Sequence, residues 1–261
     1  MKNLAAVLLA LLLLSGCNEK KPTEADLAEA EKEYNYRTAI QQYKLGANAL
    51  NDKETLTAIE HLTKAVELDS QNYSYHHWLA LAYSMNGQLP EAEGHLKQAL
   101  KINPRNAESN NLLGSILVDQ GRFEEAVAAF RTVIEDKSYP EPKFPYFNLG
   151  KCLMKQERTD QAIAAFNYAL RLDPKFYRAY IALGEIYKVK KDYLQMLHYY
   201  QKAEPAYADD VMVLFNIGLA HFHMKQFSRA KSYLAQVSIL FPPPAIDNPT
   251  QQMLQYIARV E

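Results

Sequence analysis

Cysteine is scarce in this 261-residue sequence, which has only Cys17 and Cys152. The residues around Cys17 indicate that it is modified, as argued below, so no internal disulfide is expected even in an oxidising compartment. Cys152 falls inside a predicted helix. A buried and unreactive thiol is the expected state of such a residue, and pairing with a second molecule is the alternative.

Neither sign of charge is in excess, because 29 lysines and arginines are balanced by 30 aspartates and glutamates. Binding of nucleic acid requires a concentrated basic surface that neutralises phosphates. The sequence has no basic stripe with interleaved aromatic residues. It therefore predicts no nucleic-acid partner.

Catalytic and metal-binding motifs are also missing. The sequence has no Gly-x-Gly-x-x-Gly loop, phosphate loop, Gly-x-Ser-x-Gly elbow or His-Glu-x-x-His pair. Histidines that share a metal on one helix usually lie four residues apart, whereas His76 and His77 are adjacent and His221 and His223 are two apart. We therefore predict that the protein is not an enzyme and that it has no cofactor or metal site.

A repeat with a period of 34 residues is the main feature that is present. Leucine or isoleucine followed by glycine or alanine recurs at separations of 34, 34, 36, 34 and 34 residues. The six pairs are Leu45-Gly46, Leu79-Ala80, Leu113-Gly114, Leu149-Gly150, Leu183-Gly184 and Ile217-Gly218. No segment has the alternating, valine-rich pattern of a strand, so the sequence predicts an all-α protein.

Each pair is followed at fixed distances by residues typical of a second helix. Twelve residues beyond the glycine or alanine lies a mostly small residue, and four residues further lies a large one. The large residues are Leu62, Leu96, Phe130, Phe166, Tyr200 and Leu234. Proline ends several units, at Pro104, Pro174 and Pro242. This pattern resembles the tetratricopeptide repeat, a pair of antiparallel helices with small residues where the two helices cross.

The resemblance implies a right-handed superhelical solenoid of six helix-turn-helix repeats over residues 39–244. Residues 245–261 are expected to form a C-terminal capping helix, since a terminal repeat must cover its apolar face. Residues 17–38 are expected to contain a short polar tether and the start of the first helix, with Thr23 as its N-cap.

The N-terminus has the pattern of a bacterial lipoprotein. Residues 1–16 include Lys2 and an apolar run from Leu4 to Leu14, which is too short to span a bilayer and is typical of a signal peptide. The following Leu-Ser-Gly-Cys resembles a lipobox, which implies removal of residues 1–16 and acylation of Cys17. An ordinary secretory signal with an incidental cysteine is the alternative.

The lipid and the residue after Cys17 predict where the protein resides. Two or three acyl chains hold a protein on a membrane in effect permanently, because each buried methylene contributes roughly 0.8 kcal/mol. Asn18 stands where an aspartate would, by resemblance to enterobacterial sorting, retain a lipoprotein in the inner membrane. The expected location is therefore the outer membrane, with the chain lipid-anchored and facing the periplasm.

The repeat resemblance also implies a binding surface. In tetratricopeptide arrays, positions two, five, nine, twelve and thirteen of each first helix line the concave side. At these positions the sequence places many apolar side chains, which predict a groove for a partner helix or an extended peptide. The predicted groove residues are Tyr43, Leu81, Met85, Val118, Phe144, Phe147, Met154, Ile181, Phe215, Leu219 and Phe222. The alternative is that curvature closes the groove and these side chains are core.

Three prolines interrupt the helical pattern between the third and fourth repeats, in the stretch Ser-Tyr-Pro-Glu-Pro-Lys-Phe-Pro at residues 138–145. Two extra residues fall here, and Pro140 and Pro142 prevent a continuous helix. Pro145 is expected in the first turn of the next helix, where its missing N–H does no harm. The insertion predicts either a bend in the solenoid or a neutral change in loop length.

The lipobox, the six repeats and this proline interruption together resemble type IV pilus biogenesis lipoproteins, the pilotins of the PilF, PilW and Tgl type. The resemblance implies a monomer that binds a secretin subunit through its concave surface and promotes secretin localisation and multimer assembly at the outer membrane. The alternative is a lipid-anchored periplasmic adaptor that docks cell-wall enzymes or proteases, for which the same anchor and groove would serve.

Overall fold

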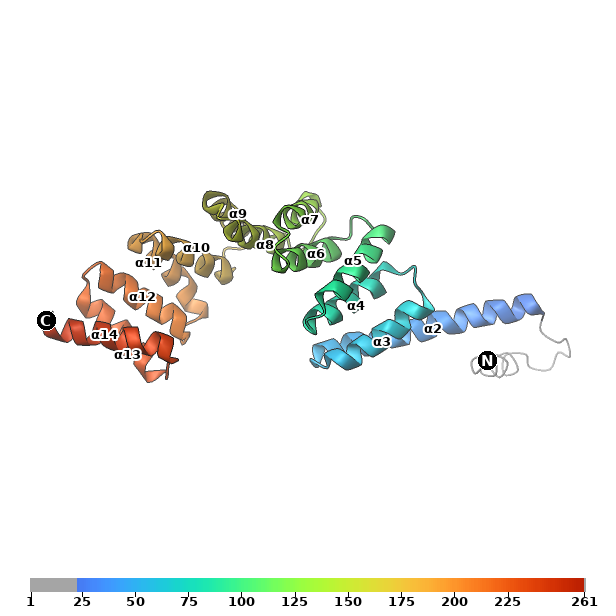
Figure 1. Cartoon of the computed structure of the whole chain (residues 1–261), viewed down its shortest axis with the longest axis horizontal. Helices are drawn as coiled ribbons and strands as arrows, with labels where there is room; N and C mark the ends of the chain where they lie inside the picture. Colours follow the sequence, from blue (N-terminus) through green and yellow to red (C-terminus); the bar gives the residue numbers. More distant parts are fainter. Residues whose placement is uncertain (1–22, 261) are drawn as a thin grey trace. The chain divides into compact units, whose positions relative to one another are not determined.

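The computed structural model describes residues 23–260, and within this range the chain forms thirteen α-helices and one 3₁₀ turn, with no strand (Figure 1). The described chain divides after Asp136 into two compact units. The predicted signal peptide, residues 1–16, and the predicted lipidation site Cys17 lie outside the described residues. Among residues 23–260, no helix is both long enough and apolar enough to cross a bilayer.

Unit 1, which ends at Asp136, contains three helix pairs. Its helices are α2 (Glu24–Asn51), α3 (Thr55–Leu68), α4 (Tyr73–Met85), α5 (Leu89–Ile102), α6 (Ala107–Asp119) and α7 (Phe123–Glu135). Helix α2 is the longest because it begins before the first repeat. Thr23 is its N-cap, as the sequence predicts: Thr23 Oγ1 accepts a hydrogen bond from Asp26 N–H, and Asp26 Oδ2 accepts one from Thr23 N–H.

Unit 2, which begins at Lys137, contains the other three pairs and a final helix. Its elements are α8 (Lys143–Lys155), α9 (Thr159–Leu172), α10 (Tyr177–Val189), α11 (Tyr193–Ala203), η1 (Glu204–Ala206), α12 (Val211–His223), α13 (Phe227–Ile239) and α14 (Pro244–Val260). Pro145 lies in the first turn of α8. The boundary between the units falls directly before the proline interruption.

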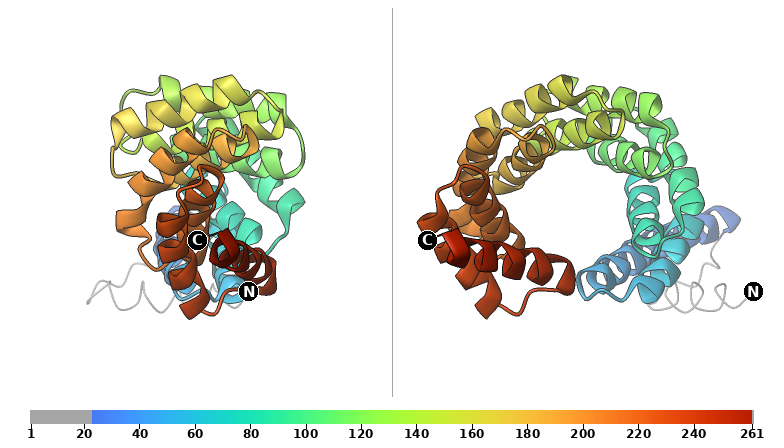
Figure 2. Two further views of the ribbon diagram at one scale, coloured as in Figure 1. Left: turned by 90° about the vertical axis from the view of Figure 1, so that its left-hand side faces the viewer. Right: turned by 60° about the vertical axis from the view of Figure 1, so that its left-hand side comes forward.

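The two helices of each repeat lie side by side (Figure 2), and they meet at the small residue that marks the repeat. A Cβ atom on Gly150 would lie 2.6 Å from Phe166 Cε1, and one on Gly184 would lie 2.7 Å from Tyr200 Cε2. The large residue of the second helix therefore occupies the space that a side chain would need. The small residue of the first helix and the large residue of the second helix, which recur in the sequence, are in contact with each other in the structure. This contact confirms the helix-turn-helix repeat.

Every first helix ends in the same turn. After α2, Lys53 adopts a left-handed conformation, with φ of 63°, and Glu54 N–H donates to Ala49 C=O. This is the Schellman arrangement, which binds carbonyls that the helix end would leave unpaired. The residues in the left-handed position are Lys53, Gly87, Gly121, Glu157, Lys191 and Lys225. Because each turn has the same geometry, all six second helices leave their first helices in a similar direction.

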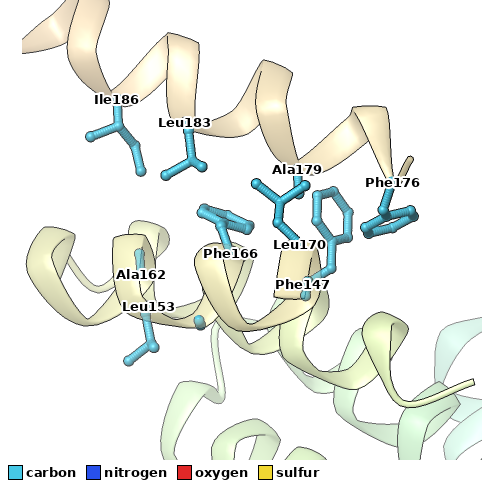
Figure 3. Close-up of a cluster of buried hydrophobic side chains, with 11 residues drawn as sticks. Phe147, Leu153, Ala162, Phe166, Leu170, Phe176, Ala179, Leu183 and Ile186 are labelled. Carbon is cyan, nitrogen blue, oxygen red and sulfur yellow. The ribbon is translucent and has the colours of Figure 1, made fainter. Parts of the chain in front are cut away.

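The core of unit 2 lies between consecutive helices (Figure 3). Phe166 on α9 is buried between Gly150 on α8 and Leu183 on α10. Within unit 2, α9 thus contacts the first helices on both sides of it in the sequence, α8 and α10. Stability is built from neighbouring repeats rather than from one centre.

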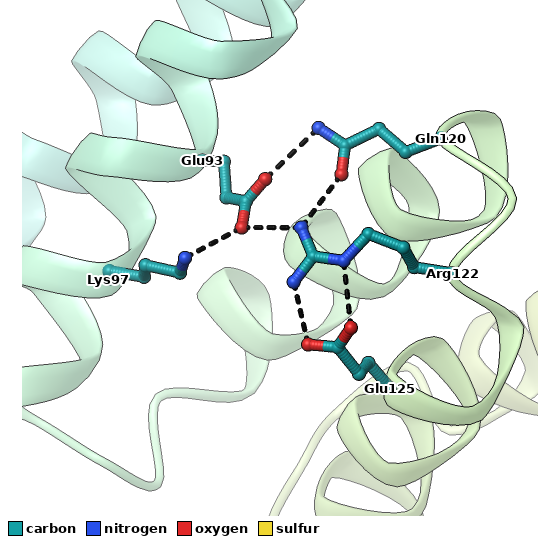
Figure 4. A network of polar contacts seen from close by, with 5 residues as sticks. All are labelled: Glu93, Lys97, Gln120, Arg122 and Glu125. Atoms are coloured by element: carbon teal, nitrogen blue, oxygen red, sulfur yellow. Dashed lines mark hydrogen bonds and ion pairs between the residues drawn. The ribbon is translucent and has the colours of Figure 1, made fainter.

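A network of ion pairs links the second and third repeats in unit 1 (Figure 4). Glu93 on α5 lies 2.7 Å from Lys97 Nζ and 2.7 Å from an Arg122 terminal nitrogen, and its second oxygen accepts from Gln120. Arg122 also binds Glu125 through two hydrogen bonds. Only 8% of Glu93 is exposed, so the carboxylate depends on these partners for its charge.

Candidate protein-binding surface

We use the term first-helix face for the residues at positions two, five, nine, twelve and thirteen of each first helix, numbered so that the marker glycine or alanine is position eight. These positions lie on one side of the helix. Positions two, five, nine and twelve follow one another at spacings of three or four residues, which is about one helical turn, and position thirteen is next to position twelve. The glycine lies next to these positions and contacts the second helix. The face therefore begins beside the contact between the two helices of the repeat.

The eleven predicted groove residues differ in how much of their surface is open. Met85 is 49% exposed. Seven are half-buried: Tyr43, Leu81, Phe144, Met154, Ile181, Leu219 and Phe222. Three are buried within the chain itself, at 7% exposure for Val118, 6% for Phe147 and 8% for Phe215. These three side chains are buried and are not open to a partner.

Phe147 is buried by aromatic neighbours in unit 2. Its ring centroid lies 5.5 Å from that of Phe166 and 5.1 Å from that of Phe176 (Figure 3). The Arg178 guanidinium lies 5.1 Å from the same ring. The sequence could not show this burial, because Phe176 and Arg178 come from the following loop and helix.

Phe215 and Phe222 are covered by the C-terminal helix. Phe215 lies in one apolar cluster with Ile246, Met253 and Ile257 of α14. The ring of Phe222 lies 5.5 Å from that of Tyr256. Helix α14 therefore packs on the face of α12 and covers part of it.

In unit 1, the first-helix face contains a small depression of about 280 Å³ lined by Tyr73, Ser74, His77, Trp78, Asn106 and Glu108. His77 Nδ1 lies 3.1 Å from Ser109 Oγ, and burial lowers the pKa of the His77 imidazole. Trp78 also makes an edge contact with Tyr43. The predicted positions included neither Trp78 nor Tyr73, although Trp78 is the only tryptophan in the sequence.

Histidines at the repeat crossings have structural partners. His61 Nδ1 lies 2.7 Å from Gln42 Oε1, and in the next repeat His95 Nδ1 lies 3.1 Å from His76 Nδ1. The same two positions, nineteen residues apart, are therefore paired in both repeats. Within residues 23–260, no group of three or more potential ligands is placed to hold a metal ion.

A polar cluster on unit 2 holds a carboxylate on the first-helix face. The Tyr200 hydroxyl donates to Glu185 Oε1, and Asn216 Nδ2 lies 3.1 Å from the same hydroxyl and 2.8 Å from Met212 O. Tyr200 is 1% exposed and Asn216 is fully buried. Burial, followed by the Glu185 hydrogen bond, raises the pKa of Tyr200, so its hydroxyl stays protonated and donates to Glu185. The other repeats have leucine or phenylalanine at the Tyr200 position.

Comparison with known families agrees with this architecture. Profiles described as tetratricopeptide repeat match residues 61–94, 79–141, 145–176 and 212–243. The chain is a tetratricopeptide repeat protein. Human superkiller complex protein 3 illustrates how general the repeat is, since it is 26% identical over 75% of this chain but only 13% of its own length.

The repeat protein is similar over almost its whole length to the type IV pilus assembly protein PilF of Pseudomonas aeruginosa. The two are 26% identical over 242 residues, which are 91% of this chain and 93% of PilF. The solved PilF structure has a TM-score of 0.73 with 22% identity, over 87% of this chain and 99% of that one. The structure of PilW, described as a type IV pilus biogenesis factor, gives 0.72 and 22%, over 84% and 98%. These matches confirm the resemblance to the PilF and PilW type.

Proposed function

We propose that this repeat protein acts in type IV pilus biogenesis as a pilotin, which binds a secretin subunit and carries it to the outer membrane. The observation that carries the proposal is the match to PilF, because it extends over 91% of this chain and 93% of PilF. A match confined to generic repeats would cover a small part of the relative, as it does for superkiller complex protein 3.

The role we propose is binding without covalent chemistry. Tetratricopeptide scaffolds generally work by binding other proteins, and the structure offers first-helix faces with half-buried apolar side chains in both units. An extended segment or a helix of the partner would contact such a face through its own apolar side chains. A monomer is sufficient for this role.

The lipid anchor is the second part of the proposal. Cys17 is followed by only five residues, 18–22, before the N-cap of α2 at Thr23. Acyl chains on Cys17 would therefore hold the start of α2 close to the membrane surface. The lipid anchor would bring the protein to the membrane, and the repeats would bind the secretin. Mutations can therefore remove either function separately.

The test compares cells with and without this gene for heat- and detergent-resistant secretin multimers in the outer-membrane fraction. We expect the multimers to disappear while secretin monomer persists. A Cys17→Ala variant should also lack outer-membrane multimers, whereas Cys152→Ala, which removes the other thiol, should keep them. Unchanged multimers in the deletion strain would rule out the pilotin role, and the anchored adaptor for cell-wall enzymes or proteases would then be the function to test.

A further inference from the structure

Two neighbouring first helices of unit 2 present matched rows of side chains. Along α8 the row is Phe144, Phe147, Lys151 and Met154, of which Phe147 is buried, and along α10 it is Arg178, Ile181, Glu185 and Lys188. Spacings of three and four residues place each row on one side of its helix. The Arg178 guanidinium lies 5.1 Å from the centre of the Phe147 ring, so the two rows are in contact. We call this surface the α8–α10 face.

The charge of the first-helix positions differs between the units. In unit 1, these positions of α2, α4 and α6 include no lysine or arginine and two acids, Glu108 and Asp119. In unit 2, the same positions of α8, α10 and α12 include four basic residues and one acid, Glu185. The basic residues are Lys151, Lys155, Arg178 and Lys188. A nearly neutral chain thus concentrates positive charge on one face of one unit.

The single acid on this face is already engaged. Glu185 accepts from the Tyr200 hydroxyl, lies 3.4 Å from Asn216 Nδ2, and forms an ion pair of 3.7 Å with Lys188. Tyr200 and Asn216 are buried polar groups, and burying a polar group is costly unless it is hydrogen-bonded. Glu185 is therefore fixed by the core and partly neutralised by Lys188.

Lys151 and Arg178 remain as exposed cations beside apolar side chains. Lys151 is one helical turn from Phe147 on α8, and Arg178 lies over the same ring. Half-buried Phe144, Met154 and Ile181 lie in the same rows. A guanidinium that stacks on an aromatic ring keeps its planar set of N–H donors available for a carboxylate.

We propose that the α8–α10 face binds a partner segment that carries both acidic and apolar side chains. The proposal rests on the proposed function and specifies the chemistry of the segment that this face recognises. The acidic side chains would pair with Lys151 and Arg178, and the apolar ones would cover Phe144, Met154 and Ile181.

A peptide titration tests the face directly. The probe is a fluorescent twelve-residue peptide with glutamate at every second position and leucine or serine between, and its comparator has glutamine in place of glutamate. The full-length lipoprotein in detergent should bind the glutamate peptide at least tenfold more tightly than the glutamine peptide. This preference should shrink as salt is raised from low to physiological strength. Equal affinity for the two peptides would overturn the proposal.

Charge reversal locates the binding site. The double variant Lys151→Glu with Arg178→Glu should bind the glutamate peptide at least tenfold more weakly than wild type. The control is Lys202→Glu with Lys175→Glu, two exposed lysines of unit 2 outside the first-helix face, and it should stay within about twofold of wild type. An equal loss in both double variants would show a general charge effect and would overturn the assignment to this face.

The same variants separate this inference from the proposed function. If the deletion strain loses secretin multimers and the Lys151→Glu, Arg178→Glu strain retains them at the wild-type level, the pilotin role stands and the α8–α10 face is not its recognition surface. If the deletion strain retains multimers, the pilotin role itself fails. Circular dichroism of the purified double variant should show wild-type helical content, so that loss of binding is not loss of fold.

Discussion

At the residue scale, the marker glycines of the first helices show how tightly the pairs pack. A methyl group on Gly150 would lie 2.6 Å from Phe166 Cε1, and Phe166 is 1% exposed, so its ring has no room to move away. Gly94 on α5 has the opposite surroundings, because a methyl group there would meet no atom of a neighbouring element within 4 Å. Two glycines, both within helices, therefore have different physical roles.

We predict that Gly150→Ala lowers the free energy of unfolding by about 1–3 kcal/mol, because it overfills the crossing of α8 and α9. Gly94→Ala should instead raise it by about 0.5–1 kcal/mol, because alanine loses less backbone entropy in a helix. Urea denaturation followed by circular dichroism measures both. Similar effects of the two substitutions would contradict the tight crossing.

Phe147 was predicted to line the groove but is buried, so a substitution there is expected to affect stability. The sequence places Phe147 in the predicted groove, but its ring is packed against Phe166 and Phe176. We predict that Phe147→Ala destabilises the protein by about 3–5 kcal/mol. Phe241, which is 93% exposed, supplies the control, and Phe241→Ala should change stability by no more than about 0.5 kcal/mol. Thermal unfolding of both variants tests this, and an unchanged midpoint for Phe147→Ala would contradict the observed core.

At the element scale, the link between α5 and the α6–α7 turn depends on one carboxylate. Hydrogen bonds from Lys97 and then from Arg122 lower the pKa of Glu93 from its ordinary value of 4.5 to about 2. A carboxylate with a lowered pKa stabilises the fold above its ordinary pKa, and this stabilisation disappears as pH falls toward the lowered value. The contribution is on the order of 2–3 kcal/mol at neutral pH.

We therefore predict that the stability of the wild-type protein falls between about pH 4.5 and pH 2, and that Glu93→Gln removes part of this fall. At pH 7 the variant should already be less stable, because a glutamine amide group would meet the cationic groups of Lys97 and Arg122. Glu135→Gln, an exposed carboxyl at the end of α7, is the control. Parallel pH profiles for wild type and Glu93→Gln would show that the network adds nothing to stability.

Helix α14 is the second element whose role can be tested. Ile257 is fully buried in the cluster that includes Phe215 and Leu234, while Gln255 on the same helix is exposed. We predict that Ile257→Asp loosens the last repeat, because an unpaired charge in this cluster is costly, and that Gln255→Asp does not. Amide hydrogen exchange should show loss of protection in α12 and α13 for Ile257→Asp alone. Equal protection in the two variants would mean that α14 does not cap the repeat.

At the scale of the whole molecule, the sequence predicts the repeats well because their period is a packing requirement. A small residue occurs at the position of Gly150 and a large one at the position of Phe166 in every repeat, because the two helices of each pair must cross at a small residue. The turns were harder to predict: Lys53, Glu157 and Lys191 adopt a left-handed conformation that usually favours glycine. The burial of a groove residue depends on side chains from the next helix or from α14. The repeat in the sequence does not show which of these side chains will lie against it. The Glu185 and Tyr200 pair was missed for the same reason, although tyrosine at a leucine or phenylalanine position was a visible signal.

The claim that the repeats bind a secretin subunit through the α8–α10 face can be tested by photocrosslinking in living cells. A photoreactive amino acid is placed in turn at Lys151 and Met154 on the α8–α10 face, and at Lys202 on the second helix α11. We expect a secretin adduct from the probe at Lys151 and from the probe at Met154, and none from the probe at Lys202. If Lys151 and Met154 give no secretin adduct while the protein is present at its normal level, or if Lys202 gives an equal yield, the claim is contradicted.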